Sequence, residues 1–139
     1  MRKIHLYLLI FLIALVGAAC GESEPEQPEA SETFIQVINN SARQITSIEL
    51  KLYQNEKVQA SPTAMNADES LIVMEDAVEF DILQQDIDFD EPVTIEAVAM
   101  INGVEESAGQ TEPMELVPGE SYQFELSGDE ELHFREMTD

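Results

Sequence analysis

The feature that most constrains this sequence is a strict alternation of apolar and polar residues in several short stretches. The stretch SIELKLY places Ile48, Leu50 and Leu52 on one side of an extended chain, with polar or charged residues between them. AVEFDIL (77–83) and SYQFELS (121–127) repeat the pattern. Because successive side chains of a β-strand point to opposite faces, a period of two predicts strands that are covered on one face. Since no long stretch after residue 33 carries a helical period, the sequence predicts an all-β protein.

Turn signals separate these stretches and set the expected architecture. Asn102-Gly103 favours a type I′ hairpin, because both central residues of that turn need positive φ. Pro118-Gly119 has the residues that a type II turn prefers. Turns spaced by roughly 8 to 12 residues predict an antiparallel two-sheet sandwich of about seven to nine short strands. We expect it to be of immunoglobulin-like or transthyretin-like type, covering residues 33–139.

The first nineteen residues have the pattern of an export signal. Arg2 and Lys3 form a short basic start, an apolar run extends from Ile4 to Ala19, and the run ends in small residues. The run is shorter than the roughly 18 residues of a membrane-spanning helix, and no basic flank follows it. We therefore expect residues 1–19 to be a signal helix that is cleaved.

The end of this run, VGAAC (Val16 to Cys20), resembles the lipobox of bacterial lipoproteins. The resemblance implies cleavage between Ala19 and Cys20, after which the thiol of Cys20 carries a diacylglyceryl group and the residue becomes the new N-terminus. Gly17 stands where that family usually has an aliphatic residue. Ordinary cleavage after Ala19, which yields a secreted protein, or an uncleaved anchor therefore remain the alternatives.

The cysteine count and the net charge exclude several kinds of site and partner for the mature chain. Cys20 is the one cysteine, so the domain has no thiol for a disulfide or a zinc cluster. Without Arg2 and Lys3 the chain keeps four basic residues against its 29 acidic ones, a net charge of −25. This sign excludes nucleic acid as a partner, because a phosphate binder needs basic residues. Residues 20–32, rich in glutamate and proline and without aliphatic or aromatic side chains, predict a disordered tether.

One stretch of the domain carries candidate metal ligands. Alternating Asp86, Asp88 and Asp90 in DIDFDEP offer hard oxygen ligands of the kind that calcium prefers, although the glycine of an EF-hand loop is absent. The alternative is a solvated loop between strands. Phe89 either packs into the core, which we expect, or forms an exposed contact. His133 is expected to face solvent, and no nucleophile motif is present, so we do not expect an enzyme or a cofactor apart from that calcium ion.

Together these features predict a lipid-anchored lipoprotein outside the cytoplasm, in the cell membrane or the outer membrane. Its sandwich would be a non-catalytic interaction or structural module of the cell envelope, in contact with an envelope protein or polymer. The alternative is a ligand- or calcium-binding module, with DIDFDEP and the Asn102-Gly103 hairpin as candidate contacts.

Overall fold

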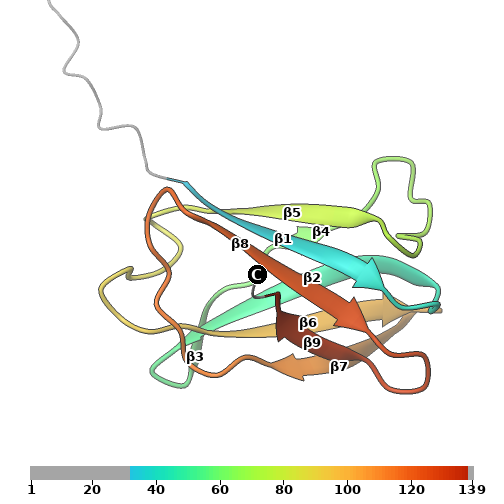
Figure 1. The fold of residues 1–139 in the computed structure, drawn as a ribbon. Helices are drawn as coiled ribbons and strands as arrows, with labels where there is room; N and C mark the ends of the chain where they lie inside the picture. The colour runs from blue at the N-terminus through green and yellow to red at the C-terminus, as the bar shows by residue number, and fades with distance from the viewer. Residues whose placement is uncertain (1–31, 138–139) are drawn as a thin grey trace, which may run out of the picture.

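The computed structural model describes residues 32–137 and contains nine strands (Figure 1). The strands are β1 (Thr33–Asn40), β2 (Ile45–Gln54), β3 (Lys57–Ala60), β4 (Thr63–Ala64), β5 (Ala77–Ile82), β6 (Thr94–Ile101), β7 (Val104–Gln110), β8 (Ser121–Ser127) and β9 (His133–Glu136). The expected signal helix and most of the tether lie outside the described residues. Within residues 32–137 no helix is long and apolar enough to cross a membrane.

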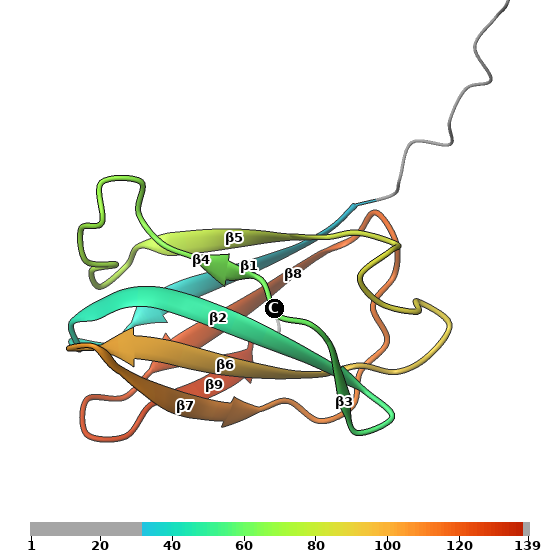
Figure 2. The ribbon, with the colours of Figure 1, turned by 180° about the vertical axis from the view of Figure 1, so that it is seen from behind.

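The strands form two sheets that face each other, which confirms the predicted all-β sandwich (Figures 1 and 2). The first sheet has the order β5-β1-β8-β9, and the second has the order β3-β2-β6-β7 with β4 paired to β2. All pairings are antiparallel except one, because β1 and β8 run parallel. A tight turn can join only antiparallel neighbours, and β1 and β8 lie far apart along the chain. The alternation pattern therefore did not reveal this parallel pair.

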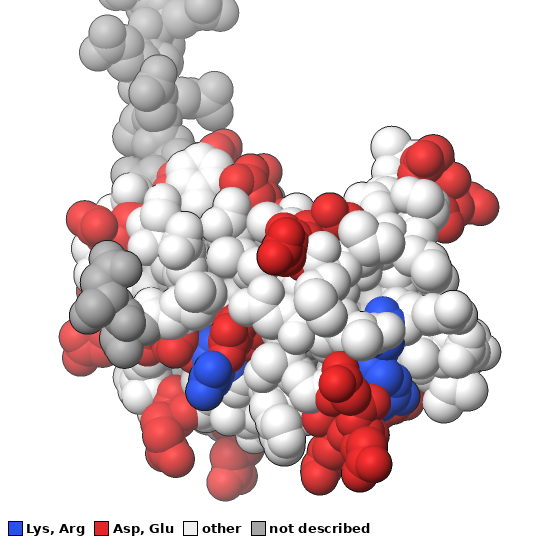
Figure 3. Space-filling view, turned by 45° about the vertical axis from the view of Figure 1, so that its right-hand side comes forward, with Lys and Arg blue, Asp and Glu red and all other residues white. Residues whose placement is uncertain are grey.

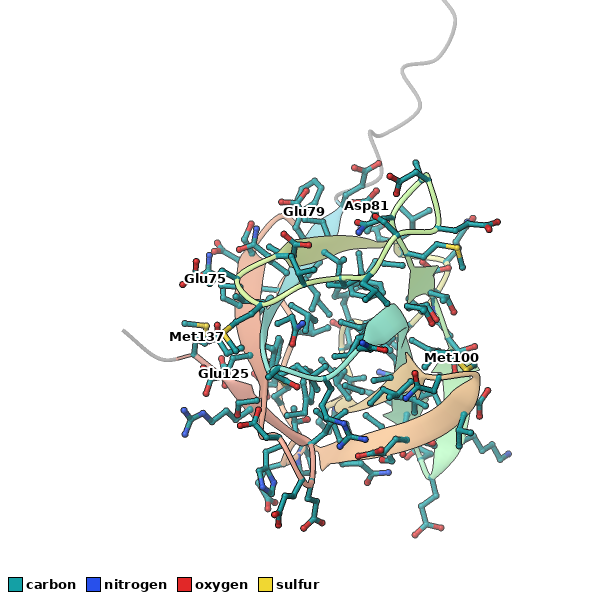
Figure 4. All side chains as sticks on the ribbon, turned by 90° about the vertical axis from the view of Figure 1, so that its right-hand side faces the viewer. Glu75, Glu79, Asp81, Met100, Glu125 and Met137 are labelled. Carbon is teal, nitrogen blue, oxygen red and sulfur yellow. The ribbon has the colours of Figure 1, made fainter. Side chains whose placement is uncertain are left out.

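The space between the sheets is filled by the apolar positions of the alternating stretches. Ile48, Leu50 and Leu52 are fully buried, as predicted, and so are Phe124 and Leu126. In the first sheet the stacked rings of Phe124 and Phe134 have centroids 4.9 Å apart. Figure 4, a view along the sandwich, shows side chains of both sheets meeting between them. Each fully buried Leu or Ile contributes about 1.5 to 3 kcal/mol through the area it removes from water.

Tyr122 and Glu125 of β8 lie on the faces that alternation predicts, but alternation alone does not predict how far each is buried. Tyr122 packs against the core, as the alternation in SYQFELS predicts, and is half-buried. Its hydroxyl accepts a hydrogen bond from the Val117 backbone N–H (2.9 Å) and donates one to the Glu115 carbonyl (3.3 Å). Glu125 was expected to point outward to solvent. It lies on the outer face, yet Asn40 and Arg135 cover it and leave it buried.

The predicted turns have the backbone conformations that their residues favour. Asn102 and Gly103 have φ of 52° and 78°, as a type I′ hairpin requires. Gly119 has φ of 86°, which fits the second central residue of a type II turn. Asn55 and Glu56 also have positive φ, so the β2–β3 hairpin uses the same kind of turn without a glycine.

Strand register divides the loops between two ends of the sandwich. Thr33 pairs with Ile82, and Asn40 with Ser127, so β1 runs from one end to the other. We call the end with Thr33 proximal and the end with Asn40 distal. The proximal end carries loops 55–56, 83–93 and 111–120, and the distal end carries loops 41–44, 65–76, 102–103 and 128–132 (Figure 1).

Candidate functional site

In the predicted calcium loop, two apolar side chains pack inward and the side chain of one glutamine bonds to the loop backbone. Ile87 is buried and Phe89 is packed against the core, which confirms the expected packing of Phe89. The Gln54 amide donates to the carbonyls of Asp88 (2.6 Å) and Glu91 (3.1 Å) and accepts from the Asp88 N–H (3.0 Å). Gln54 is itself buried at the end of β2, so these bonds fix the loop to the second sheet.

The three aspartates of this loop do not converge. One Asp86 carboxylate oxygen accepts from the Leu83 N–H (2.8 Å), and one Asp88 oxygen accepts from the Asp90 N–H (3.0 Å). Such bonds close local turns. Across residues 32–137, no group of three His, Cys, Asp or Glu side chains is placed to hold a metal ion. The structure therefore does not bring the three predicted aspartates together.

A groove of about 620 Å³ opens beside this loop at the proximal end. Tyr53, Asn55, Glu91 and Gln110 lie among its lining residues. Within it the Asn55 amide donates to the Glu91 carboxylate at 2.6 Å. Sequence reasoning did not single out this groove, because its walls come from the β2–β3 turn, the β5–β6 loop and the end of β7.

Next to the groove, the Glu96 carboxylate accepts hydrogen bonds from side chains of two neighbouring strands. The Tyr53 hydroxyl on β2 lies 2.6 Å from one carboxylate oxygen, and the Ser107 hydroxyl on β7 lies 2.7 Å from the other. Burial raises the pKa of Glu96, but the hydrogen bonds from Tyr53, Ser107 and Gln110 together outweigh it and the pKa is lowered. The bond to Glu96 raises the pKa of Tyr53. Tyr53 is thus a neutral phenol that donates to the Glu96 carboxylate and links β2 to β6. The bond from Ser107 links β7 to the same carboxylate.

A second carboxylate cluster lies on the outer face of the first sheet. The Asn40 amide on β1 donates to Glu125 at 2.9 Å, and Arg135 on β9 forms an ion pair with the same carboxylate. The hydrogen bond from Asn40 is the largest cause that lowers the pKa of Glu125; burial opposes it, and Arg135 adds to it. Figure 4 shows Glu125 on the side of the sandwich away from Met100, which lies on the second sheet. The cluster joins three strands of one sheet.

The distal end has its own polar connection and the second predicted contact. The Arg43 guanidinium donates two hydrogen bonds to the Glu106 carboxylate in a bidentate pair, at 3.2 and 2.8 Å. It also donates to the backbone carbonyls of Asp129 and Glu130. The nearby Asn102-Gly103 tip is exposed. His133 is exposed on β9, as expected.

The loop 65–76 at this end was not selected by sequence reasoning. It exposes Met65, Leu71, Val73 and Met74, while Ile72 between them is fully buried. A run such as LIVM is typical of a buried strand, so only the structure separates the buried residue from its exposed neighbours.

On the face that Figure 3 shows, the acidic side chains do not form a single patch. Figure 3 shows acidic side chains scattered over the visible face, with the few basic side chains next to acidic ones. The predicted lipidation residue, Cys20, and the cleavage position at Ala19 lie outside the described residues.

Comparison with known proteins adds distant likenesses. No family model matches the chain, and no curated protein matches it either. Among solved structures it is similar to the human-specific toxin intermedilysin (TM-score 0.40, 6% identity), covering 78% of this chain and 23% of that chain. It is also similar to a Gram negative toxin (0.38, 11% identity, 78% and 23%) and to listeriolysin O (0.39, 8%, 79% and 23%). The chain thus spans about a quarter of those toxins, and likenesses at this level do not indicate a shared function.

Proposed function

We propose that this chain is a lipid-anchored lipoprotein of the cell envelope whose β-sandwich is a non-catalytic interaction module. The observation that carries the proposal is the sequence VGAAC, which ends an apolar export signal in the chain's only cysteine. The diacylglyceryl group on Cys20 would supply two acyl chains, which are enough for stable membrane attachment where one is marginal.

The segment between anchor and sandwich supports this arrangement. Twelve residues separate Cys20 from Thr33, and fully extended they reach at most roughly 40 Å. Thr33 lies at the proximal end of the sandwich, and β1 extends from there for about 25 Å. Attachment at Cys20 would therefore leave the distal loops free to meet an envelope protein or polymer.

The polar clusters support a contact role over a catalytic one. Glu96 is held by Tyr53 and Ser107, and Glu125 by Asn40 and Arg135. In the described part of the chain, no buried side-chain nitrogen or oxygen lacks a hydrogen-bond partner. These carboxylates therefore have structural partners that account for their lowered pKa values.

Metabolic labelling with palmitate tests the anchor. The wild-type full chain, produced in a bacterial host, is expected to carry label and to sediment with membranes. Cys20→Ala should lose the label and leave the membrane fraction. Gly17→Leu, which restores the usual aliphatic residue of a lipobox, is the matched control and should stay labelled. An unlabelled wild-type protein in the soluble fraction would contradict the proposal.

A further inference from the structure

The loop 65–76 concentrates the exposed apolar surface of the described chain. Nine large apolar side chains are exposed among residues 32–137, and four of them belong to this loop. Their exposed fractions are 57% for Met65, 37% for Leu71, 55% for Val73 and 50% for Met74. Scattered single exposures are ordinary, but several in one short segment are typical of an interaction site.

A buried anchor fixes this loop to both sheets. Ile72 is fully buried, and its backbone N–H donates to the Ile45 carbonyl of the second sheet at 2.8 Å. Its carbonyl accepts from the side-chain amide of Asn39, a buried residue of β1, at 2.7 Å. Asn39 also exchanges backbone bonds with Glu75 (2.7 Å) and Asp76 (2.8 Å). The loop therefore has a defined position between the two sheets at the distal end.

Local hydrogen bonds shape the two turns that present the apolar side chains. The Asn66 amide donates to the Leu71 carbonyl at 2.9 Å, and the Val73 N–H donates to the Asp76 carboxylate at 2.9 Å. Glu69 and Glu75 have φ of 59° and 73°, a conformation that costs about 1 to 3 kcal/mol in a residue other than glycine. A surface ordered before binding loses less entropy when a partner binds, so this loop is suited to docking.

The acidic residues around these apolar side chains indicate which kind of partner the loop would attract. Asp68, Glu69, Glu75 and Asp76 lie in the same loop. The one Lys or Arg of the distal loops, Arg43, is already bonded to Glu106 and to the backbone carbonyls of Asp129 and Glu130. Figure 3 shows acidic side chains at the tip of the protruding part of the surface, and Figure 4 shows Glu75 on the outside of this loop. An anionic lipid surface and a second copy of this acidic chain would both be repelled. A protein with an apolar pocket bordered by Lys and Arg would be attracted.

We propose that Met65, Leu71, Val73 and Met74 form the docking surface of this chain for a basic protein of the cell envelope. The proposal rests on the proposed function, because it names the face and the partner class of that interaction module. Leu71 and Val73 enter an apolar pocket of the partner, and the four carboxylates pair with its Lys and Arg side chains. A few residues at the centre of an interface carry most of its binding energy, and Met is among the residue types enriched in interfaces.

Site-specific photo-crosslinking in cells tests the docking surface. The full chain is produced with benzoylphenylalanine in place of Val73, or in place of Val117, which is similarly exposed but lies at the proximal end. The Val73 position is expected to give a cross-link to one protein, and the Val117 position is expected not to. Cross-links to lipid, to a second copy of this chain, to no protein, or equally from both positions would overturn the proposal.

Binding of the purified cross-linked protein tests the chemistry. Val73→Asp is expected to weaken binding by roughly tenfold or more, whereas Val117→Asp leaves it unchanged. Higher salt should weaken binding further, because the contact pairs opposite charges. Equal losses for the two variants, or binding insensitive to salt, would overturn the proposal. Thermal melts of both variants establish that they fold.

Membrane fractionation of the same cells separates this inference from the proposed function. If the chain sediments with membranes through Cys20 but position 73 gives no cross-linked protein, the docking surface is wrong and the anchor stands. If the chain is not membrane-bound, the proposed function fails independently of any cross-link.

Discussion

Gly109 and Gly128 have nearly the same backbone conformation, with φ of 99° and 98°, but different surroundings. Any other residue would be strained at either position, because φ is positive there. A Cβ at Gly109 would have no other atom within 4 Å, whereas one at Gly128 would lie 2.0 Å from the Glu131 backbone carbonyl oxygen. The β8–β9 loop thus requires glycine for space as well as for conformation.

We therefore expect Gly109→Ala to lower the free energy of unfolding by about 1 to 2 kcal/mol, which is the cost of strain alone. Gly128→Ala should lower it further, because the carbonyl of Glu131 must move. Urea unfolding of the two variants beside wild type measures both values. Equal losses would contradict the close packing of the β8–β9 loop.

At the proximal end, the aspartates of DIDFDEP stabilise their own turns. Because Asp86 and Asp88 accept bonds from nearby backbone N–H groups, we expect millimolar calcium to leave the thermal midpoint unchanged. A ligand that binds only the folded state would raise that midpoint. Melts with calcium and with magnesium make the comparison, and a rise specific to calcium would support the calcium-binding alternative.

At the scale of elements, the Glu125 cluster connects the terminal strand β9 to β8 and β1. β9 has only four residues and forms an edge of its sheet, so few backbone bonds hold it. Glu125 adds a hydrogen bond with Asn40 and an ion pair with Arg135. Such side-chain connections matter most where the strand itself is short.

The cluster should make stability depend on pH in a defined direction. The pKa of Glu125 is lowered in the folded state from 4.5, chiefly by Asn40. A lowered pKa adds stability above the unfolded value, and this is lost as pH falls through the folded pKa. We therefore expect wild type to have a higher free energy of unfolding than Glu125→Gln. The difference should be largest near neutral pH and should shrink below pH 4.5.

Urea unfolding at a series of pH values measures this difference. Glu105→Gln removes the same charge from an exposed position of β7 and corrects for the general change in charge. An advantage of wild type that stays constant or grows on acidification would contradict the assigned role of Glu125.

Much of the element order could be predicted from the sequence, because alternation and turn residues act locally. Ile48, Leu50 and Leu52, and the Asn102-Gly103 turn, carry their structural signal within a few residues. The anchoring of Ile72 could not be predicted, since it depends on Asn39, which lies 33 residues away. The Glu96 cluster likewise joins separate strands and leaves no local pattern.

At the scale of the whole molecule, the excess of acidic residues acts against the compact state. The domain gathers these charges on a small surface, and their mutual repulsion is relieved on unfolding. The apolar core between the sheets outweighs that repulsion. The same charges would attract a partner that carries basic groups.

Screening these charges should therefore stabilise the fold. Raising NaCl from about 0.01 M to about 0.1 M shortens the Debye length from about 30 Å to about 10 Å. We expect the thermal midpoint of the mature domain to rise over this range, and KCl should act as NaCl does. An unchanged or falling midpoint would indicate that attractive charge pairs dominate the surface.

The central claim is attachment through Cys20, and mass spectrometry of the mature N-terminus tests it most directly. We predict an N-terminal peptide that begins at Cys20 and carries the added mass of a diacylglyceryl group, absent from Cys20→Ala. An unmodified Cys20, or a mature chain that begins at another residue, would contradict the claim.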